Sequence, residues 1–255
     1  NTFNFSSIEI NSLFSVLYLL SLVILFTPFG EFFLSESFPR KMNHNTGDSG
    51  SYINYSFESL EIILSQHRSF GLPLILKLYT FFDEKLTYWP FVTFLFYIIS
   101  NNFMLNTLIT NNFSKVFSCI FCFLVFMSYN VWEYTFGWTE IWGISFFILS
   151  ISLMIISINK KNIFILLLFS ITLFYTIQIR PSFIFIIFFP IIFSIYFYFH
   201  KNYIIFAKLI LASLTPLIFF IILKFSLTGS VGITSFTGVQ LSGHAGFYIN
   251  EKTLS

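Results

Sequence analysis

The ionisable side chains that could do chemistry stand in four short stretches of the sequence, each beside apolar residues. A charged group next to lipid costs free energy unless it has a partner or a function. We therefore treat these four side chains as the centre of a candidate site. They are Asp48 in TGDSGSY, Arg68 in HRSFGLPL, Glu140 in WEYTFGWTE and Arg180 in IRPSF.

The two acids suit proton transfer, because a positioned carboxylate can accept the proton of an attacking hydroxyl group. Asp48 lies between Gly47 and Gly50, which permit a close backbone turn. The structural alternative for Asp48 is an Asx turn or a helix N-cap. Glu140 begins an apolar run, so we expect its side chain to point into or beside a helix bundle.

The two arginines suit anion binding. A planar guanidinium can hold a phosphate through paired donors, and an isolated arginine near lipid requires a carboxylate or a phosphate. The alternative for both Arg68 and Arg180 is contact with lipid headgroups.

Glu133 and Trp138 lie between them in sequence, in an aromatic stretch that suits stacking on sugar rings or a membrane-interface belt.

Other polar residues give weaker signals. The histidines lack an orienting partner in sequence, and the glycine-rich stretch 228–246 follows no Rossmann-type strand. Cys119 and Cys122 have no matching Cys or His pair, so a zinc site is not indicated. The histidines that could supply a base are His44, His67 and His244.

The composition predicts the kind of structural elements that position these residues. Of the 255 residues, 56% are hydrophobic and 9% charged, whereas a soluble domain carries about 25% charged residues. The exterior must therefore face lipid. The net charge of +2 and the absence of a basic cluster exclude a nucleic-acid partner.

We expect an all-α polytopic membrane bundle of about seven transmembrane helices, because about 20 apolar residues cross the hydrocarbon core. The chain begins with Asn1 and ends soon after a glycine-rich stretch, so we expect one transmembrane domain over 1–255, truncated at its C-terminus. The expected spans are 13–34, 90–111, 115–131, 138–158, 162–179, 182–199 and 203–225.

The polar region 35–89 is expected to form the first extracytoplasmic loop. Within it, the spacing of apolar residues over 51–66 predicts an amphipathic helix along the membrane surface. The run 70–82 is too short to span and predicts an interfacial or re-entrant segment. The loops near Lys115, Lys160 and His200 contain lysines and no acid, which favours a cytoplasmic N-terminus.

The order of these features resembles the GT-C glycosyltransferases of bacteria, in the branch similar to protein O-mannosyltransferases and lipid A aminoarabinose transferases. The resemblance rests on the first span, GDSGSY with Tyr52, the pattern R-x-x-G-x-P-L from Arg68, Thr139-Glu140 and Arg180-Pro181. The family pattern Gly-Tyr-Pro is Gly71-Leu72-Pro73 here, and the paired acids of many members are the single Asp48.

The resemblance implies transfer of a sugar from a polyprenyl-phosphate carrier to a lipid, glycan or protein acceptor, at the extracytoplasmic face of a bacterial inner or plasma membrane. It implies Asp48 and Glu140 as catalytic acids. Substrate contacts would come from Arg68, Arg180, Tyr52, Glu133 and Trp138. A divalent metal, Mg²⁺ or Mn²⁺, could be held by Asp48 together with substrate phosphate.

Three alternatives remain open. A lipid-linked oligosaccharide flippase or transporter would place polar groups at mid-membrane depth in broken helices. A polysaccharide polymerase or ligase would use Arg and His of later loops. An acyltransferase would need a histidine within the bundle, and His200 is expected on the cytoplasmic side.

Overall fold

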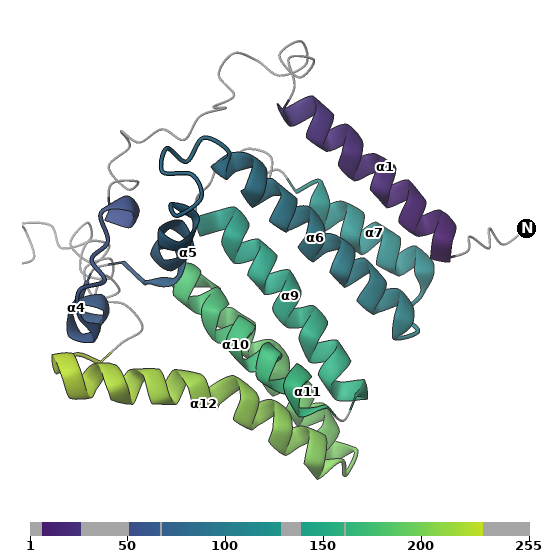
Figure 1. Ribbon diagram of the computed structural model, residues 1–255. Helices are drawn as coiled ribbons and strands as arrows, with labels where there is room; N and C mark the ends of the chain where they lie inside the picture. The colour runs from purple at the N-terminus through teal and green to yellow at the C-terminus, as the bar shows by residue number, and fades with distance from the viewer. Residues whose placement is uncertain (1–6, 27–50, 67, 129–138, 161, 232–255) are drawn as a thin grey trace, which may run out of the picture.

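The computed structural model describes residues 7–26, 51–66, 68–128, 139–160 and 162–231, and the regular elements in these ranges are all helical. Figure 1 shows helices packed side by side, with α1 and α12 at opposite edges of the bundle. In chain order the elements are α1 (Ser7–Phe26), α4 (Leu60–Ser65), α5 (Gly71–Tyr79), α6 (Trp89–Thr110), α7 (Lys115–Phe126), α9 (Thr139–Asn159), α10 (Ile163–Ile179), the 3-10 helix η1 (Pro181–Ile187), α11 (Phe188–Phe199) and α12 (Tyr203–Thr228).

Buried polar contacts join α1, α6, α7 and α9. The Tyr18 hydroxyl donates to Asn101 Oδ1 at 2.7 Å, and Asn101 Nδ2 donates to the Cys122 carbonyl at 3.2 Å. Trp142 Nε1 donates to Thr93 Oγ1 at 3.0 Å. Between helices in lipid the hydrophobic effect is weak, so such hydrogen bonds and close packing provide the specificity.

The second half of the bundle consists of α9, α10, η1, α11 and α12. The hydroxyls of Ser150 and Thr176 lie 3.2 Å apart between α9 and α10, and Ser170 donates to the Ala212 carbonyl of α12 at 2.6 Å. Helices α6 and α9 begin, and α10 and α12 end, at what we call the Arg180 end of the bundle. The opposite end, where α6 and α9 end and α12 begins, is the Lys208 end (Figure 1).

Four described helices are long and apolar enough to cross a membrane: Trp89–Thr110, Thr139–Asn159, Pro181–Phe199 and Tyr203–Thr228. They coincide with the expected spans 90–111, 138–158, 182–199 and 203–225. The chain is therefore a helical protein of the membrane type, as the composition predicts.

The remaining three expected spans, 13–34, 115–131 and 162–179, overlap shorter apolar helices, so the structure does not establish a count of seven. These helices are Ile8–Val23, Lys115–Phe126 and Ile163–Ile179. The 12 residues of α7 rise only about 18 Å at 1.5 Å per residue, which is less than the core of about 30 Å. Helix α1 begins at Ser7, six residues before the predicted start of the first span.

Large apolar side chains cover the outward faces of these helices. Soluble monomers rarely expose contiguous apolar patches of more than a few hundred Å², so this surface suits lipid. Strongly exposed examples in the second half of the bundle are Phe164, Phe199, Ile204, Leu211 and Phe219.

The first loop is helical over a shorter length than its sequence predicts. Helix α4 covers only Leu60–Ser65 of the expected 51–66, and its N-cap Ser59 accepts from the Ile62 amide. The amide group of Gln66 exchanges two hydrogen bonds with the Ser56 backbone, at 3.0 and 2.8 Å. This closed loop satisfies backbone groups that a longer helix would have paired internally.

Helix α5 is a short segment, as predicted for 70–82, and it packs on the end of α10. The Tyr175 hydroxyl donates to the Gly71 carbonyl at 2.7 Å. A Cβ atom on Gly71 would lie 2.5 Å from the Gln178 carbonyl carbon and from the Ile179 nitrogen. Glycine at this position therefore permits direct contact between two backbones.

We predict that Gly71→Ala destabilises the protein by about 1–3 kcal/mol, because the added methyl meets backbone atoms that cannot move aside cheaply. This exceeds the gain that alanine's helix propensity could bring. Thermal unfolding in detergent measures the effect, with Lys77→Ala on the exposed face of α5 as the control. Equal stability of the two variants would show that the contact is not required.

Candidate functional site

Glu140 and Arg180, an acidic and a basic residue predicted to share a site, lie in contact in the structure. Arg180 Nη1 forms an ion pair with Glu140 Oε1. The same nitrogen donates to Thr139 Oγ1 at 3.3 Å, and Thr139 Oγ1 donates to Glu140 Oε2 at 3.2 Å. The side chains of Arg180 and Glu140 are 34% and 27% exposed, so the pair stands at an accessible rim of the Arg180 end.

Local sequence explains why Arg180 lies at this junction. A residue before proline is pushed towards extended backbone, which ends a helix. Arg180 precedes Pro181 and adopts φ −139° and ψ 101°, as the C-cap of α10 and the N-cap of η1. Its side chain is therefore anchored between two helices rather than along one of them.

Arg180 retains donors for a ligand. Its Nε donates to Ser182 Oγ at 3.1 Å, and Nη1 serves Glu140 and Thr139. A guanidinium has five N–H donors in a planar fork, and in the described part of the chain Nη2 makes no hydrogen bond. The ion pair thus orients the group while leaving one edge for an anion.

Gly143 allows η1 to approach α9 beside the pair. A Cβ atom there would lie 2.5 Å from Cε2 of Phe183 and 3.5 Å from Cβ of Arg180. The Phe183 ring in turn lies 6.0 Å from the guanidinium carbon of Arg180. Position 143, one helical turn after Glu140, therefore has to be small so that Arg180 can reach Glu140.

The first loop brings a second arginine to the same end. Arg68 lies over the Tyr52 ring at 5.1 Å and its Nε donates to Ser51 Oγ at 3.2 Å. Arg68 is three residues before Gly71, so their Cα atoms are separated by at most about 11 Å. Because Gly71 touches the backbone of Ile179, Arg68 and Arg180 belong to one end of the molecule.

Asp83 is held in a turn at this end rather than presented as a base. Its Oδ2 accepts from the Tyr79 hydroxyl at 3.2 Å and from the Tyr88 amide at 2.9 Å. Burial, together with the neighbouring Asp83 carboxylate, raises the pKa of Tyr79 to about 12. The phenol therefore stays protonated and keeps donating at neutral pH.

Several predicted site residues lie outside the described residues, so the structure does not place them relative to the pair. This group includes one of the two proposed catalytic acids and two proposed substrate contacts. They are Asp48, Glu133 and Trp138, and the same holds for the weaker candidates His44, His67 and His244.

Sequence reasoning missed Lys224, which is only 1% exposed although it lies within the α12 span. Within the described ranges its ammonium group makes no hydrogen bond or ion pair. A lysine near the end of an apolar run ordinarily extends its ammonium group to the membrane interface. The available signal was that a charge stands inside a predicted span at all.

Buried amide and hydroxyl groups without partners accompany this lysine. Gln178 is fully buried, and neither its Oε1 nor its Nε2 has a hydrogen-bond partner; Ser69 Oγ also lacks one. Buried polar atoms are almost always paired. Two such side chains near one end of a bundle therefore indicate a place where a polar ligand could bind.

An aromatic triangle places these groups near one another. Phe70 lies 6.3 Å from Phe174 and 6.2 Å from Phe220, and the last two rings are 5.4 Å apart. Ser69 precedes Phe70 in sequence. Gln178 and Lys224 follow Phe174 and Phe220, respectively, by four residues, which is one helical turn on the same face. Gln178 and Lys224 thus lie on the Arg180 side of the triangle, and Ser69 adjoins it through Phe70.

Comparison of the chain with models of protein families, with curated proteins and with solved structures finds no match. Among the described residues, no group of three or more His, Cys, Asp or Glu side chains could hold a metal ion.

We predict that Glu140 and Arg180 are energetically coupled. In a double-mutant cycle of Glu140→Gln, Arg180→Gln and both together, the double variant should be more stable than the sum of the single losses by about 1 kcal/mol, since the pair is partly exposed. Chemical unfolding in detergent measures the cycle. Additive losses, within about 0.3 kcal/mol, would show that the two groups do not interact in solution.

Proposed function

We propose that this chain is the membrane-embedded part of a glycosyltransferase that moves a sugar from a polyprenyl-phosphate carrier to an acceptor hydroxyl at the Arg180 end. The observation that carries the proposal is the Glu140–Arg180 pair at the bundle rim, with a guanidinium edge left for an anion. The resemblance to GT-C enzymes supplies the reaction class.

The two halves of this reaction require opposite charges. The acceptor hydroxyl loses a proton as it attacks the anomeric carbon, and Glu140 or Asp48 would accept that proton. The bond from the anomeric carbon to the phosphate oxygen breaks, and the leaving carrier phosphate gains negative charge. Arg180 would stabilise that charge through Nη2, in surroundings less polar than water.

Lys224, Gln178 and Ser69 support the same reading. An unpaired buried ammonium is costly in a membrane span, and a phosphate would neutralise it while accepting from the amide and hydroxyl groups. Arg68, which lies over the Tyr52 ring, is a second cation at this end and comes from the first loop. Any metal ion would be held by Asp48 with substrate phosphate, as Mg²⁺ often is in phosphate sites.

The lysine-rich loops of the Lys208 end favour a cytoplasmic location for that end. The proposed reaction would then occur on the extracytoplasmic side of a bacterial inner or plasma membrane. The acceptor would be a lipid, glycan or protein that is reached from that side.

A lipid-linked sugar transporter is a second candidate, and the burial of Lys224 within a span favours it. Helix α12 also contains Pro216, and η1 is a seven-residue 3-10 segment at the start of another span. Broken helices and buried charges are common in transporters. Release of the carrier distinguishes the two functions, because only the transferase breaks the sugar–phosphate bond.

We predict that Asp48→Asn abolishes sugar transfer and that Glu140→Gln lowers its rate by about 10²–10⁴-fold, as expected for loss of a general base or a positioning acid. The assay incubates purified protein with radiolabelled polyprenyl-phosphate sugars and measures release of the carrier. Glu84→Gln, an exposed acid in the loop before α6, is the matched control. Near-normal release by both Asp48→Asn and Glu140→Gln would remove the acids from catalysis, and intact carrier translocated across liposomes would favour the transporter.

We predict that Lys224→Met leaves thermal stability unchanged or higher, because it replaces an unpaired buried charge with a side chain of similar length. The same variant should lose at least about tenfold in carrier release, if the ammonium serves a phosphate. Lys77→Met on the exposed face of α5 controls for loss of a cation. A less stable but fully active Lys224→Met protein would assign the lysine a structural role.

A further inference from the structure

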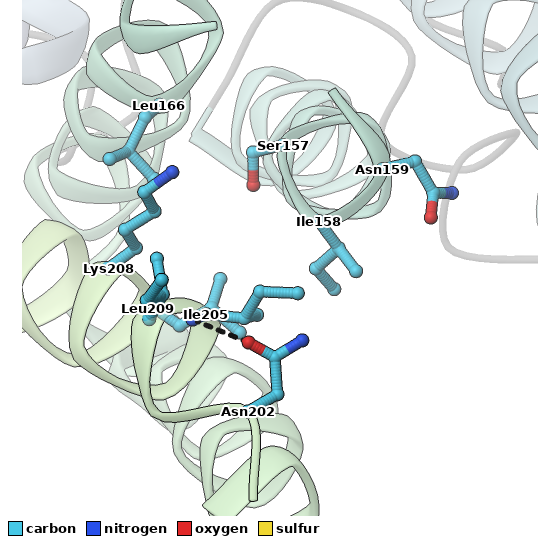
Figure 2. Close-up of a pocket in the computed structure, with 9 residues that line it drawn as sticks. Ser157, Ile158, Asn159, Leu166, Asn202, Ile205, Lys208 and Leu209 are labelled. Atoms are coloured by element: carbon cyan, nitrogen blue, oxygen red, sulfur yellow. Dashed lines mark hydrogen bonds between the residues drawn. The ribbon is translucent and has the colours of Figure 1, made fainter. Parts of the chain in front are cut away.

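The Lys208 end contains a cavity that the proposed reaction does not use. It has a volume of about 210 Å³ and lies between the end of α9 and the starts of α10 and α12. Figure 2 shows Lys208 extending along it towards Leu166, with Ser157 of α9 across from the lysine. The cavity is thus at the opposite end of the spans from the Glu140–Arg180 pair.

The polar lining of this cavity includes two donor groups, on Lys208 and Asn202, beside Ser157, whose hydroxyl donates to the Met154 carbonyl at 2.8 Å. Lys208 is a half-buried residue, and in the part of the chain that the structure describes its ammonium group makes no hydrogen bond or ion pair. Asn202 uses its Oδ1 to accept from the Ile205 amide at 3.4 Å, which leaves its Nδ2 group as a donor (Figure 2). An occupant that accepts hydrogen bonds would satisfy both groups.

The surrounding charge has one sign. Between Glu140 and Glu251 the sequence contains no Asp or Glu, so α10, α11, α12 and their connections supply no carboxylate to Lys208. Lys160 and Lys201 are exposed in the two loops beside the cavity. Among the described residues of these elements, the charges beside the cavity are therefore positive, which favours an anion as the occupant.

The remaining lining is apolar, with Ile158, Leu166 and Leu209 among its residues. A cavity of about 210 Å³ is smaller than the roughly 300–1,000 Å³ of sites that bury drug-sized ligands. A whole nucleotide would therefore exceed it. The glycerol phosphate part of a phospholipid would fit, because the acyl chains would lie outside the cavity along the exposed apolar helix faces.

We propose that this cavity binds the phosphate headgroup of an anionic phospholipid from the leaflet that surrounds the Lys208 end. Lys208 provides the charge and Asn202 the neutral donor, while the apolar wall contacts the glycerol backbone. Basic pockets between transmembrane helices are a recurrent way to hold anionic headgroups. The proposal is independent of the sugar-transfer reaction, because it concerns the other end of the spans.

The test measures binding of short-chain phosphatidylglycerol to the purified full chain in neutral detergent by native mass spectrometry. Phosphatidylcholine of the same chain length and inorganic phosphate are the comparison ligands. We expect phosphatidylglycerol to bind more tightly than both, Lys208→Gln to weaken it about fivefold, and Lys208→Arg to retain it.

Lys201→Gln is the matched control, because Lys201 is an exposed cation in the adjacent turn and is absent from the cavity wall. It should change the affinity less than twofold. Equal binding by wild type and Lys208→Gln would overturn the proposal, as would an equal loss in Lys201→Gln, which would indicate general surface charge. Inorganic phosphate binding as tightly as the lipid would overturn the assignment to a membrane lipid.

Discussion

The Glu140–Arg180 ion pair is the interaction on which the candidate site depends. A charge near the hydrocarbon core needs a counter-charge, and these two residues satisfy each other between α9 and the α10–η1 junction. The pair requires Pro181 to end α10 and Gly143 to let η1 approach. Because the guanidinium is held by its Nε and Nη1, its remaining edge points where an anion could be bound without further ordering of the side chain.

Much of this arrangement could be predicted from sequence. Glu140 and Arg180 are lone charges at the ends of apolar runs, and the alternation of spans brings the start of one run and the end of the next to the same side. The apolar runs also predict where the helices lie, since each expected span overlaps a described helix, and four of these helices are long enough to cross. The local sequence pattern thus predicts the order of the helices and which helix ends lie together at one end of the bundle.

Other features depend on tertiary contacts that no local pattern shows. The apolar spacing over 51–66 suits a helix, but Gln66 and Ser56 bond to each other, and only 51–53 and α4 are helical. Lys224 stands near the end of its run, where lysines ordinarily reach water, and its burial arises where α12 packs against α4 and α10 (Figure 1). The cavity beside Lys208 likewise lies where the end of α9 meets the starts of α10 and α12, and their separate sequences do not indicate it.

We propose that the Arg180 end holds a lipid phosphate, and photo-crosslinking tests this most directly. A polyprenyl phosphate with a diazirine next to the phosphate would be reconstituted with the full chain in nanodiscs, irradiated, and its adducts located by mass spectrometry. We predict adducts concentrated on the peptides around Arg180 and Lys224, and competition by unlabelled polyprenyl phosphate. Adducts spread evenly over the lipid-facing helices, or absent from the peptides around Arg180 and Lys224, would contradict a phosphate site at the Arg180 end.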